Sequence, residues 1–174
     1  EWRTGRPGPT LAMRFDIDCI PVAESTDPDH VPFKEGFASR HPGEMHACGH
    51  DGHTAIGLGV AAIIPQIADQ LCGNIRLIFQ PAEEGCRGAN PMAEAGVVDD
   101  VDYLLAVHLG CGVPSGHLYT RIDGLLASSK LDVTFTGTPA HAGSAPHAGR
   151  NAVLAMAQAI QGLYAISRHG DGTS

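Results

Sequence analysis

The chain has 174 residues, 43% of them hydrophobic, and its 11 basic against 19 acidic residues give a net charge of −8. This length suits one globular domain or parts of two, and the acidic balance disfavours electrostatic attraction to nucleic acid or to an anionic membrane surface. The longest apolar and glycine run, residues 55–64, is far shorter than the roughly 20 residues of a membrane-spanning helix, so we expect neither nucleic acid nor a membrane as a partner.

The first predicted elements are a strand, a long loop and a helix. Residues 11–17 (LAMRFDI) form a short apolar run after two prolines, which predicts a buried strand. Residues 21–42 are polar and interrupted by proline and glycine, so we expect a long surface loop, which usually has a functional reason. Residues 53–70 are mostly good helix formers, with Thr54 as the expected N-cap and a kink or break at Pro65.

Two more strands and a short helix follow. Residues 74–80 (NIRLIFQ) and 103–107 (YLLAV) predict strands, and residues 89–95 predict a helix closed by Gly96. The alternation predicts an α/β fold with a mainly parallel sheet and flanking helices. Ligands of such sheets gather beyond the carboxyl ends of the strands. The polar residues expected there are Asp16, Glu83, Glu84 and His108.

The pattern changes after about Ala127, where we place a boundary between a domain of residues 1–126 and the start of a second domain, residues 127–174. From Lys130 onward apolar and polar side chains alternate, which predicts a half-buried strand of an open antiparallel sheet. Residues 151–167 carry an apolar stripe at helical spacing and predict an amphipathic helix. The second segment is therefore expected to begin an α+β domain.

The cysteines do not form a recognisable framework. Five is an odd number, they are scattered, and no Cys-x-x-Cys pair occurs, so a disulfide scaffold or a four-cysteine zinc ribbon is not expected. We see no basic-then-apolar leader and expect reduced thiols in the cytoplasm. Because the sequence starts without Met and stops in a polar stretch, we expect it to be a segment of a longer protein. The cysteines are Cys19, Cys48, Cys72, Cys86 and Cys111.

Residues 46–53 (HACGHDGH) are the most informative stretch. They place three His, one Cys and one Asp within eight residues, with glycines that let the backbone bend around a small centre. Thiolate and imidazole are preferred ligands of Zn²⁺ and related divalent ions, and a carboxylate can add an oxygen ligand. The alternative is a polar loop before a helix, but the composition favours a metal site.

Two adjacent carboxylates, Glu83 and Glu84, follow the strand at residues 74–80. If the backbone there is extended, their side chains diverge, so one can bind metal while the other stays free. A metal lowers the pKa of its water to about 7, and a free carboxylate nearby can accept the proton as the water attacks a carbonyl. The alternative is a charged turn after a strand.

Three further histidines carry less information by themselves. His108 follows a predicted strand, where a hydrogen-bonded rim residue is the usual case, but it shares the sheet edge with the acidic pair and is therefore expected to be a ligand. His141 and His147 lie in the turn-rich residues 137–149. A donor from the second domain could stabilise an oxyanion, or both could be simple turn residues.

Other catalytic motifs are not supported. Residues 57–62 (GLGVAA) formally match the dinucleotide-binding fingerprint, but they sit inside a helix pattern, so we expect helix packing there. The sequence contains no His-Glu-x-x-His, no Walker lysine motif and no Gly-x-Ser-x-Gly elbow.

Three blocks in this order resemble the aminoacylase/carboxypeptidase family of co-catalytic metallohydrolases: residues 45–55 (MHACGHDGHTA), 77–85 (LIFQPAEEG) and 106–108 (AVH). Residues 96–103 (GVVDDVDY) and 14–18 (RFDID) are similar to the branch that holds hippurate, N-acyl-amino-acid and indole-acetyl-amino-acid amidohydrolases. The resemblance covers essentially the whole chain. It implies a zinc-peptidase-like catalytic domain with an inserted lid domain, beginning near Ala127, through which the protein forms a homodimer or heterodimer.

The resemblance also implies roles for individual residues. Glu83 is expected to be the general base, and His141 the lid histidine that supports the oxyanion in a neighbouring active site. Two divalent ions are expected; the thiolate favours Zn²⁺, whereas carboxylates and imidazoles also accept Mn²⁺. Their expected ligands in this chain are Cys48, His50, Glu84 and His108.

The sequence departs from the family pattern at two places. Many members bind a metal through a His-x-Asp pair after an early strand, but here that region reads RFDID, as in the cysteine-using branch, so Asp16 and Asp18 are not assigned as ligands. The family supplies its last metal-ligating histidine beyond position 174.

The expected function is metal-dependent hydrolysis of the amide between an acyl or aroyl group and an amino acid, with p-aminobenzoyl-glutamate as the favoured small-molecule substrate. A hippurate-type deacylase or a dipeptidase is the alternative within the same chemistry. A metal-binding partner subunit without turnover, or a structural metal site in a peptide-binding protein, is the alternative from another class. An open coordination position would separate a catalyst from a scaffold.

Overall fold

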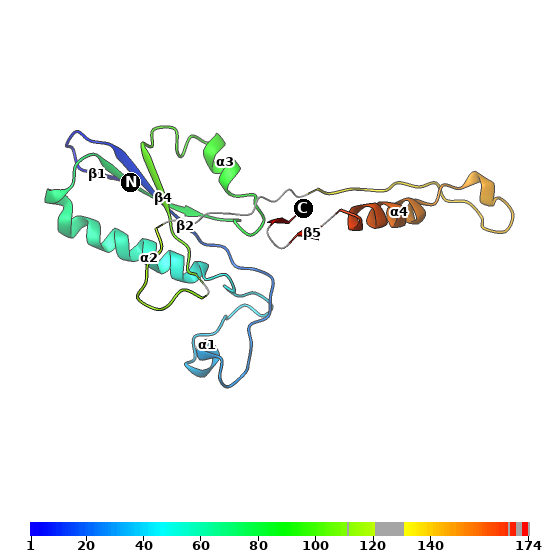
Figure 1. Cartoon of the computed structure of the whole chain (residues 1–174), viewed down its shortest axis with the longest axis horizontal. Helices are drawn as coiled ribbons and strands as arrows, with labels where there is room; N and C mark the ends of the chain where they lie inside the picture. Colours follow the sequence, from blue (N-terminus) through cyan, green and yellow to red (C-terminus); the bar gives the residue numbers. More distant parts are fainter. Residues whose placement is uncertain (111, 121–130, 167, 170–171, 174) are drawn as a thin grey trace. The chain divides into compact units, whose positions relative to one another are not determined.

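The computed structural model describes residues 1–110, 112–120, 131–166, 168–169 and 172–173 (Figure 1). The chain divides into two compact units, Glu1–Pro114 and Ser115–Ser174. The predicted domain boundary at Ala127 lies outside the described residues and stays a prediction.

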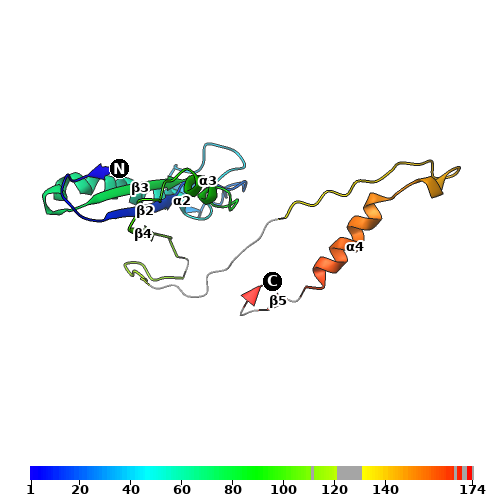
Figure 2. The same ribbon diagram turned by 90° about the horizontal axis from the view of Figure 1, so that it is seen from above.

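A four-stranded sheet in the order β1-β3-β2-β4 forms the centre of the first unit (Figure 2). β2 (Thr10–Asp16) pairs in parallel with β3 (Asn74–Gln80) and with β4 (Tyr103–Ala106), while β1 (Trp2–Arg3) pairs antiparallel with β3 at the edge. The predicted mainly parallel sheet is therefore confirmed, and its three longer strands lie where the apolar runs place them. β1 is too short to show any periodicity in the sequence.

The helix that carries the metal-site motif begins earlier than predicted. α2 spans His50–Ile63 and continues into a 3-10 helix, η1 (Ile64–Gln70), which has a proline in its first turn. The prediction of Thr54 as N-cap is wrong: the helix is preceded by Gly49 at φ 81°, and the Thr54 hydroxyl donates to the carbonyl of His50 inside the helix at 2.8 Å. A glycine tolerates this left-handed conformation without steric cost, so the helix can start directly after it.

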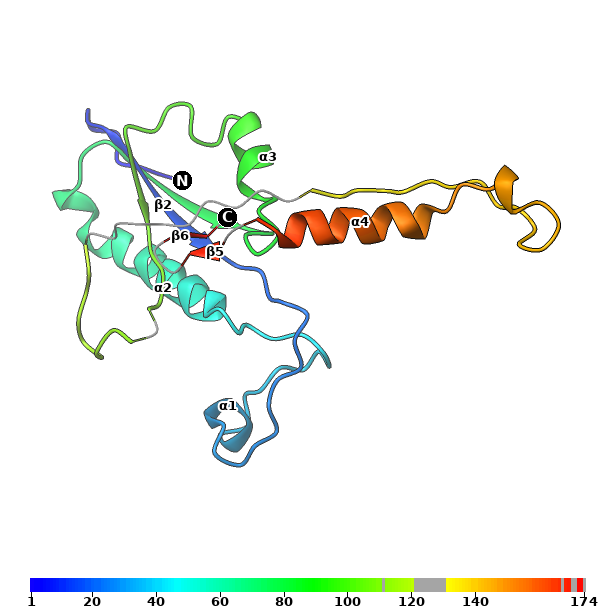
Figure 3. The ribbon, with the colours of Figure 1, turned by 45° about the vertical axis from the view of Figure 1, so that its right-hand side comes forward.

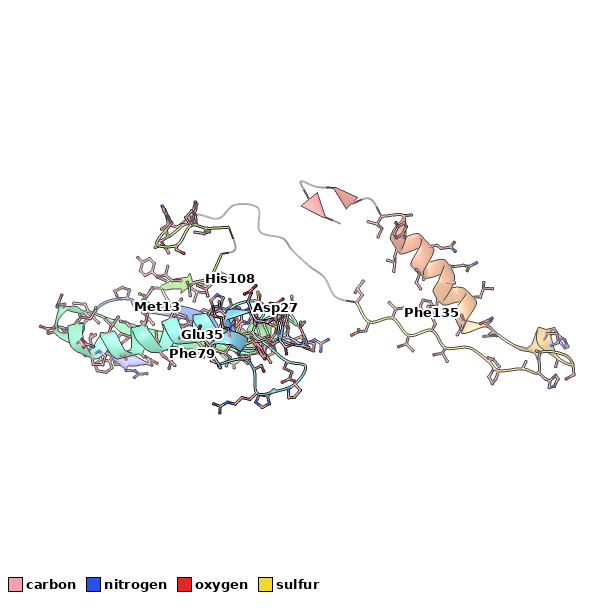
Figure 4. The ribbon with its side chains drawn as sticks, turned by 90° about the horizontal axis from the view of Figure 1, so that it is seen from below. Met13, Asp27, Glu35, Phe79, His108 and Phe135 are labelled. Carbon is pink, nitrogen blue, oxygen red and sulfur yellow. The ribbon has the colours of Figure 1, made fainter. Side chains whose placement is uncertain are left out.

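One face of α2 lies against the sheet, as the view from below shows (Figure 4). Its buried residues His50, His53 and Gly57 recur at helical spacing. A Cβ atom added at Gly57 would lie 2.7 Å from a ring carbon of Phe79 and 2.9 Å from one of Phe15. Gly57 thus permits a close approach of helix and sheet, which confirms helix packing rather than dinucleotide binding for the glycine-rich run.

Replacing Gly57 by Ala is expected to destabilise the protein by about 1–3 kcal/mol, because the added methyl group overpacks the contact with two aromatic rings. Gly59 in the same helix is the matched control: it is exposed, with no atom within 4 Å of an added Cβ. Gly59→Ala should therefore stabilise the helix by about 0.5–1 kcal/mol. Chemical denaturation of both variants measures the difference, and equal effects would contradict the packing argument.

The remaining elements of the first unit are short. α3 (Ala89–Glu94) ends before Gly96, whose φ of 77° agrees with the predicted closing glycine. The predicted loop at residues 21–42 contains one turn of helix, α1 (Val31–Lys34), and is otherwise irregular. Figure 3 shows this loop extending away from the sheet.

The second unit contains α4 (Ala152–Tyr164), whose N-cap Asn151 accepts hydrogen bonds from the backbone N–H groups of Val153 and Leu154. It also contains a 3-10 turn, η2 (Pro146–Ala148), and a two-stranded hairpin of β5 (Arg168–His169) and β6 (Gly172–Thr173). The helix predicted at residues 151–167 is therefore present, although shorter.

The strand predicted from Lys130 is not formed in the described residues. Lys130 itself lies outside them, and residues 131–137 have no strand structure; one isolated bridge, Thr138 to Arg150, follows. Alternating side chains describe two faces of a surface, but a strand also needs a neighbouring backbone to complete its hydrogen bonds. Among the described residues no segment pairs with 131–137, which is why the alternating pattern alone is misleading here.

The four cysteines within the described part of the chain, Cys19, Cys48, Cys72 and Cys86, are free thiols, as expected for a chain without a disulfide framework. Cys111 lies outside it. None of the helices in the described residues is both long enough and apolar enough to span a membrane.

Candidate metal centre

The predicted site residues of the first unit converge at the carboxyl ends of the three parallel strands. Ligand atoms of Cys48, His50 and His108 lie within 4.8 Å of one another, and so do those of His50, Glu83 and Glu84. His108 follows β4 and is labelled in Figure 4. His50 is shared by the two groups, so the structure brings all five residues into one cluster.

His50 is completely buried, and its hydrogen bonds define which nitrogen is free to bind. Its Nδ1 lies 2.9 Å from the carbonyl oxygen of Asp18. Because a carbonyl can only accept, Nδ1 carries the proton and Nε2 presents a lone pair. This Nε2 has no hydrogen-bond partner among the described residues. Metal-binding histidines usually donate their other ring nitrogen to a carbonyl or carboxylate in this way.

Three carboxylate oxygens surround the lone pair of His50 at distances too long for a hydrogen bond. Nε2 lies 3.7 Å from Oδ2 of Asp16, 3.8 Å from Oε2 of Glu83 and 3.9 Å from Oε1 of Glu84. Acceptors cannot satisfy one another, whereas a cation can be shared by several of them. Separations of this size suit atoms bound to one ion through bonds of about 2 Å. The buried nitrogen and its neighbours therefore fit a divalent metal.

Cys48 and His108 form the other side of the cluster, with Sγ 3.6 Å from Nε2 of His108. Nδ1 of His108 donates to the carbonyl of Leu109 at 2.7 Å, which again leaves Nε2 with its lone pair. Burial raises the pKa of the Cys48 thiol, and the carboxylates of Glu84 and Glu83 raise it further. A nearby cation would reverse this effect and favour the thiolate. The sulfur, nitrogen and oxygen donors suit Zn²⁺, while the nitrogen and oxygen donors also suit Mn²⁺.

Asp18 connects the strand end to two residues of the cluster. Its Oδ2 accepts from the backbone N–H of Glu84 at 3.1 Å, and its Oδ1 lies 3.2 Å from Nδ1 of His50. Burial raises the pKa of Asp18, but the backbone N–H groups of Glu84 and Glu83 outweigh it and lower the pKa overall. Asp18 therefore orients its neighbours as a carboxylate. The sequence analysis does not assign this role, because no spacing rule marks a contact made through backbone atoms.

Asp16 and His53 form a fully buried pair beside the cluster. Oδ1 of Asp16 is paired with Nδ1 of His53, and Oδ2 lies 2.8 Å from Nη1 of Arg14. Burial raises the pKa of Asp16, but the hydrogen bond from His53 and the charge of Arg14 lower it overall. Nε2 of His53 accepts from the backbone N–H of Leu109 at 2.8 Å. Both nitrogens of His53 are thus in use, so its place in the motif does not make it a free ligand.

The two histidines of the second unit lie in turns. Nδ1 of His141 accepts from the backbone N–H groups of Gly143 and Ser144, each at 3.1 Å, so the proton of the neutral ring lies on Nε2. His147 lies in η2. The role of His141 at an active site stays a prediction.

Comparison with known proteins supports a metallohydrolase. The sequence model of peptidase family M20/M25/M40 matches residues 12–173. The chain is 60% identical to the indole-3-acetyl-aspartic acid hydrolase of Enterobacter agglomerans and 56% identical to one of the subunits of the p-aminobenzoyl-glutamate hydrolase of Escherichia coli, in each case over 171 residues. Each match covers 98% of this chain but 39% of the relative, so the chain spans about two fifths of the length of these relatives.

Two solved structures share the fold. An aminobenzoyl-glutamate utilization protein from Klebsiella pneumoniae is 50% identical, with a TM-score of 0.72 over 98% of this chain and 36% of its own. A peptidase from Bacillus subtilis is 42% identical, with a TM-score of 0.56 over 63% of this chain and 28% of its own. The latter is described as a dinuclear metal-binding peptidase of the M20 family.

Proposed function

The chain belongs to peptidase family M20/M25/M40, and on this premise we propose that the protein containing it is a metal-dependent amidohydrolase. The observation that carries the proposal is the buried lone pair of His50, which faces the carboxylates of Glu83 and Glu84 within 3.9 Å. Such an arrangement of acceptors needs a cation. A structural metal site would not require a further carboxylate beside its ligands, and Glu83 supplies one.

The favoured substrates are amides between an aromatic acyl group and an acidic amino acid. The names of the two relatives each describe such a compound: indole-3-acetyl-aspartic acid in one case and p-aminobenzoyl-glutamate in the other. We take p-aminobenzoyl-glutamate as the first substrate to test. The indole-acetyl amide is the second, because the relative named for it shares 60% identity with this chain.

Four residues would hold two divalent ions: Cys48, His50, Glu84 and His108. When bound, such ions polarise an amide carbonyl and lower the pKa of a water molecule. Glu83 lies beside His50 with its side chain 38% exposed, so it can reach solvent and substrate. It would accept the proton of the attacking water and return it to the leaving amine. Asp18 and the Asp16–His53 pair keep the neighbouring groups in their orientation.

His141 would stabilise the negative charge that develops on the carbonyl oxygen. Its Nδ1 accepts two backbone hydrogen bonds, so the proton of the neutral ring lies on Nε2, which is the donor such a role requires. By the family pattern it would serve the active site of a neighbouring protomer, in a homodimer or a heterodimer. The word "subunit" in the name of the Escherichia coli relative is consistent with a partner chain.

The test combines metal analysis with an assay on the complete natural protein that contains this chain. We expect about two metal ions per chain, as a co-catalytic site requires, and release of glutamate from p-aminobenzoyl-glutamate that depends on added Zn²⁺ or Mn²⁺. Release of aspartate from the indole-acetyl amide alone would move the substrate but keep the reaction. Stoichiometric metal without release of either amino acid would favour a partner subunit without turnover, and absence of metal would refute the site.

A further inference from the structure

A chain of contacts leads from the centre of the sheet to the residue next to a proposed metal ligand. It runs from Arg14 through Asp16 and His53 to the backbone N–H of Leu109, which directly follows His108. We propose that His53 is a positioning residue: it holds the segment that carries His108 at the metal centre without binding metal itself. The inference rests on the proposed metal centre and assigns to it a residue outside the ligand set.

The hydrogen bonds leave one protonation state for His53. The N–H of Leu109 can only donate, so Nε2 of His53 must be the acceptor and cannot carry a proton. The ring proton of a neutral imidazole then lies on Nδ1, where it is donated to the carboxylate of Asp16. His53 therefore uses one nitrogen as a donor toward β2 and the other as an acceptor toward the segment after β4.

The Asp16 end of this chain is rigid. Asp16 is completely buried, and its second oxygen is paired with Nη1 of Arg14 at 2.8 Å. The Nε of Arg14 donates to Oε1 of Gln80 at 2.9 Å, which links β2 to the end of β3. His53 itself is buried on α2. The acceptor that it offers to Leu109 is thus fixed by three elements of the fold.

The segment that carries His108 needs such a support. β4 ends at Ala106, so His108 and Leu109 lie beyond the hydrogen-bond ladder of the sheet. Leu109 also lies close over the start of α2, since a Cβ added at Gly52 would lie 2.5 Å from its Cδ1. The rings of His53 and His108 meet edge to face, with centroids 4.6 Å apart. The hydrogen bond to His53 is the one polar contact of the Leu109 N–H that the described residues provide.

Two substitutions separate the two halves of the contact. Asparagine is short and places its amide near the position of Nδ1, so His53→Asn keeps a donor for Asp16 and loses the acceptor for Leu109. Glutamine reaches farther, so His53→Gln keeps the acceptor for Leu109 and loses the donor for Asp16. We expect His53→Asn to weaken binding of the more weakly held ion by about 10-fold or more, as outer contacts of metal ligands do. His53→Gln should bind metal nearly as wild type but unfold at a lower temperature, because it leaves a buried carboxylate with one partner fewer.

Metal affinity is measured by titration of the metal-free complete protein with Zn²⁺, and the environment of the ligands by the absorption of the Co²⁺ form. His41→Asn is the matched control, because His41 is exposed and its ring forms no hydrogen bond among the described residues. If His53 only stabilised the fold, metal affinity would follow the unfolding temperature in both variants. The crossed pattern, with affinity lost in one and stability lost in the other, would not arise.

A measurement on the unaltered protein keeps the inference testable if a variant does not fold. Nitrogen NMR of the His53 ring should show a neutral ring with the proton on Nδ1, and the Leu109 amide should exchange slowly with solvent. A proton on Nε2, or His53→Asn with unchanged metal affinity, would overturn the inference. Failure of the wild-type protein to bind metal would refute the proposed function instead, so the two failures are distinguishable.

Discussion

Glu83→Gln is expected to lower turnover by a factor of about 10² to 10⁴, the usual contribution of a general base, while both metal ions stay bound. Glutamine has nearly the shape of glutamate but cannot accept a proton at neutral pH. Glu83 is suited to this role because its Oε2 lies 3.8 Å from the buried Nε2 of His50 while its side chain stays partly exposed. The measurement is kcat for the complete protein at saturating metal, together with its metal content.

Glu94→Gln is the control for the change in charge, because Glu94 is exposed in α3 and carries the same functional group away from the cluster. We expect it to leave turnover unchanged. Loss of metal from Glu83→Gln would reassign Glu83 as a ligand, and unchanged turnover would reject it as the base.

Cys48→Ser is expected to reduce metal affinity by more than about 100-fold, since loss of an outer contact alone costs 10- to 100-fold and here a ligand is replaced. A serine hydroxyl is a much weaker ligand for Zn²⁺ than a thiolate. Competition with a chelator measures the affinity in the complete protein. Cys72→Ser is the control, because Cys72 is also a free thiol but is exposed in the turn between η1 and β3. Equal affinity in both variants would remove Cys48 from the ligand set.

The same residue predicts the direction of a pH effect on metal binding. Burial and the neighbouring carboxylates raise the pKa of the Cys48 thiol in the metal-free protein, so an ion must displace a proton from it. Metal affinity of the wild type should therefore rise with pH, and Cys48→Ser should weaken this dependence. The titrations used for the affinity measure both.

The elements that can be predicted correctly are those whose side chains alone report their surroundings. β2, β3 and β4 are located by apolar runs because buried parallel strands have no polar face. The start of α2 is harder to locate because it depends on the backbone conformation of Gly49, which a sequence does not display. The strand expected near residues 131–137 depends on a partner backbone, and the alternating pattern contains no information about one.

The cluster itself is predictable to a similar limit. The sequence places Cys48, His50, Glu83, Glu84 and His108 at one sheet edge, and the structure brings them together there. The contacts of Asp18 and His53 are not predictable in this way, because each acts through a backbone N–H of a residue far away in the chain, Glu84 in one case and Leu109 in the other. Such partners follow from the fold and not from spacing.

The distance along the chain between the proposed ligands has a consequence for how the protein is maintained. Cys48 and His108 are 60 positions apart, so an ion held by both closes a long loop and restricts the unfolded chain, much as a crosslink does. Binding to the native form also shifts the folding equilibrium by mass action. The cellular supply of metal would thus govern the lifetime of the polypeptide as well as its activity, because the metal-free form opens more often to proteases.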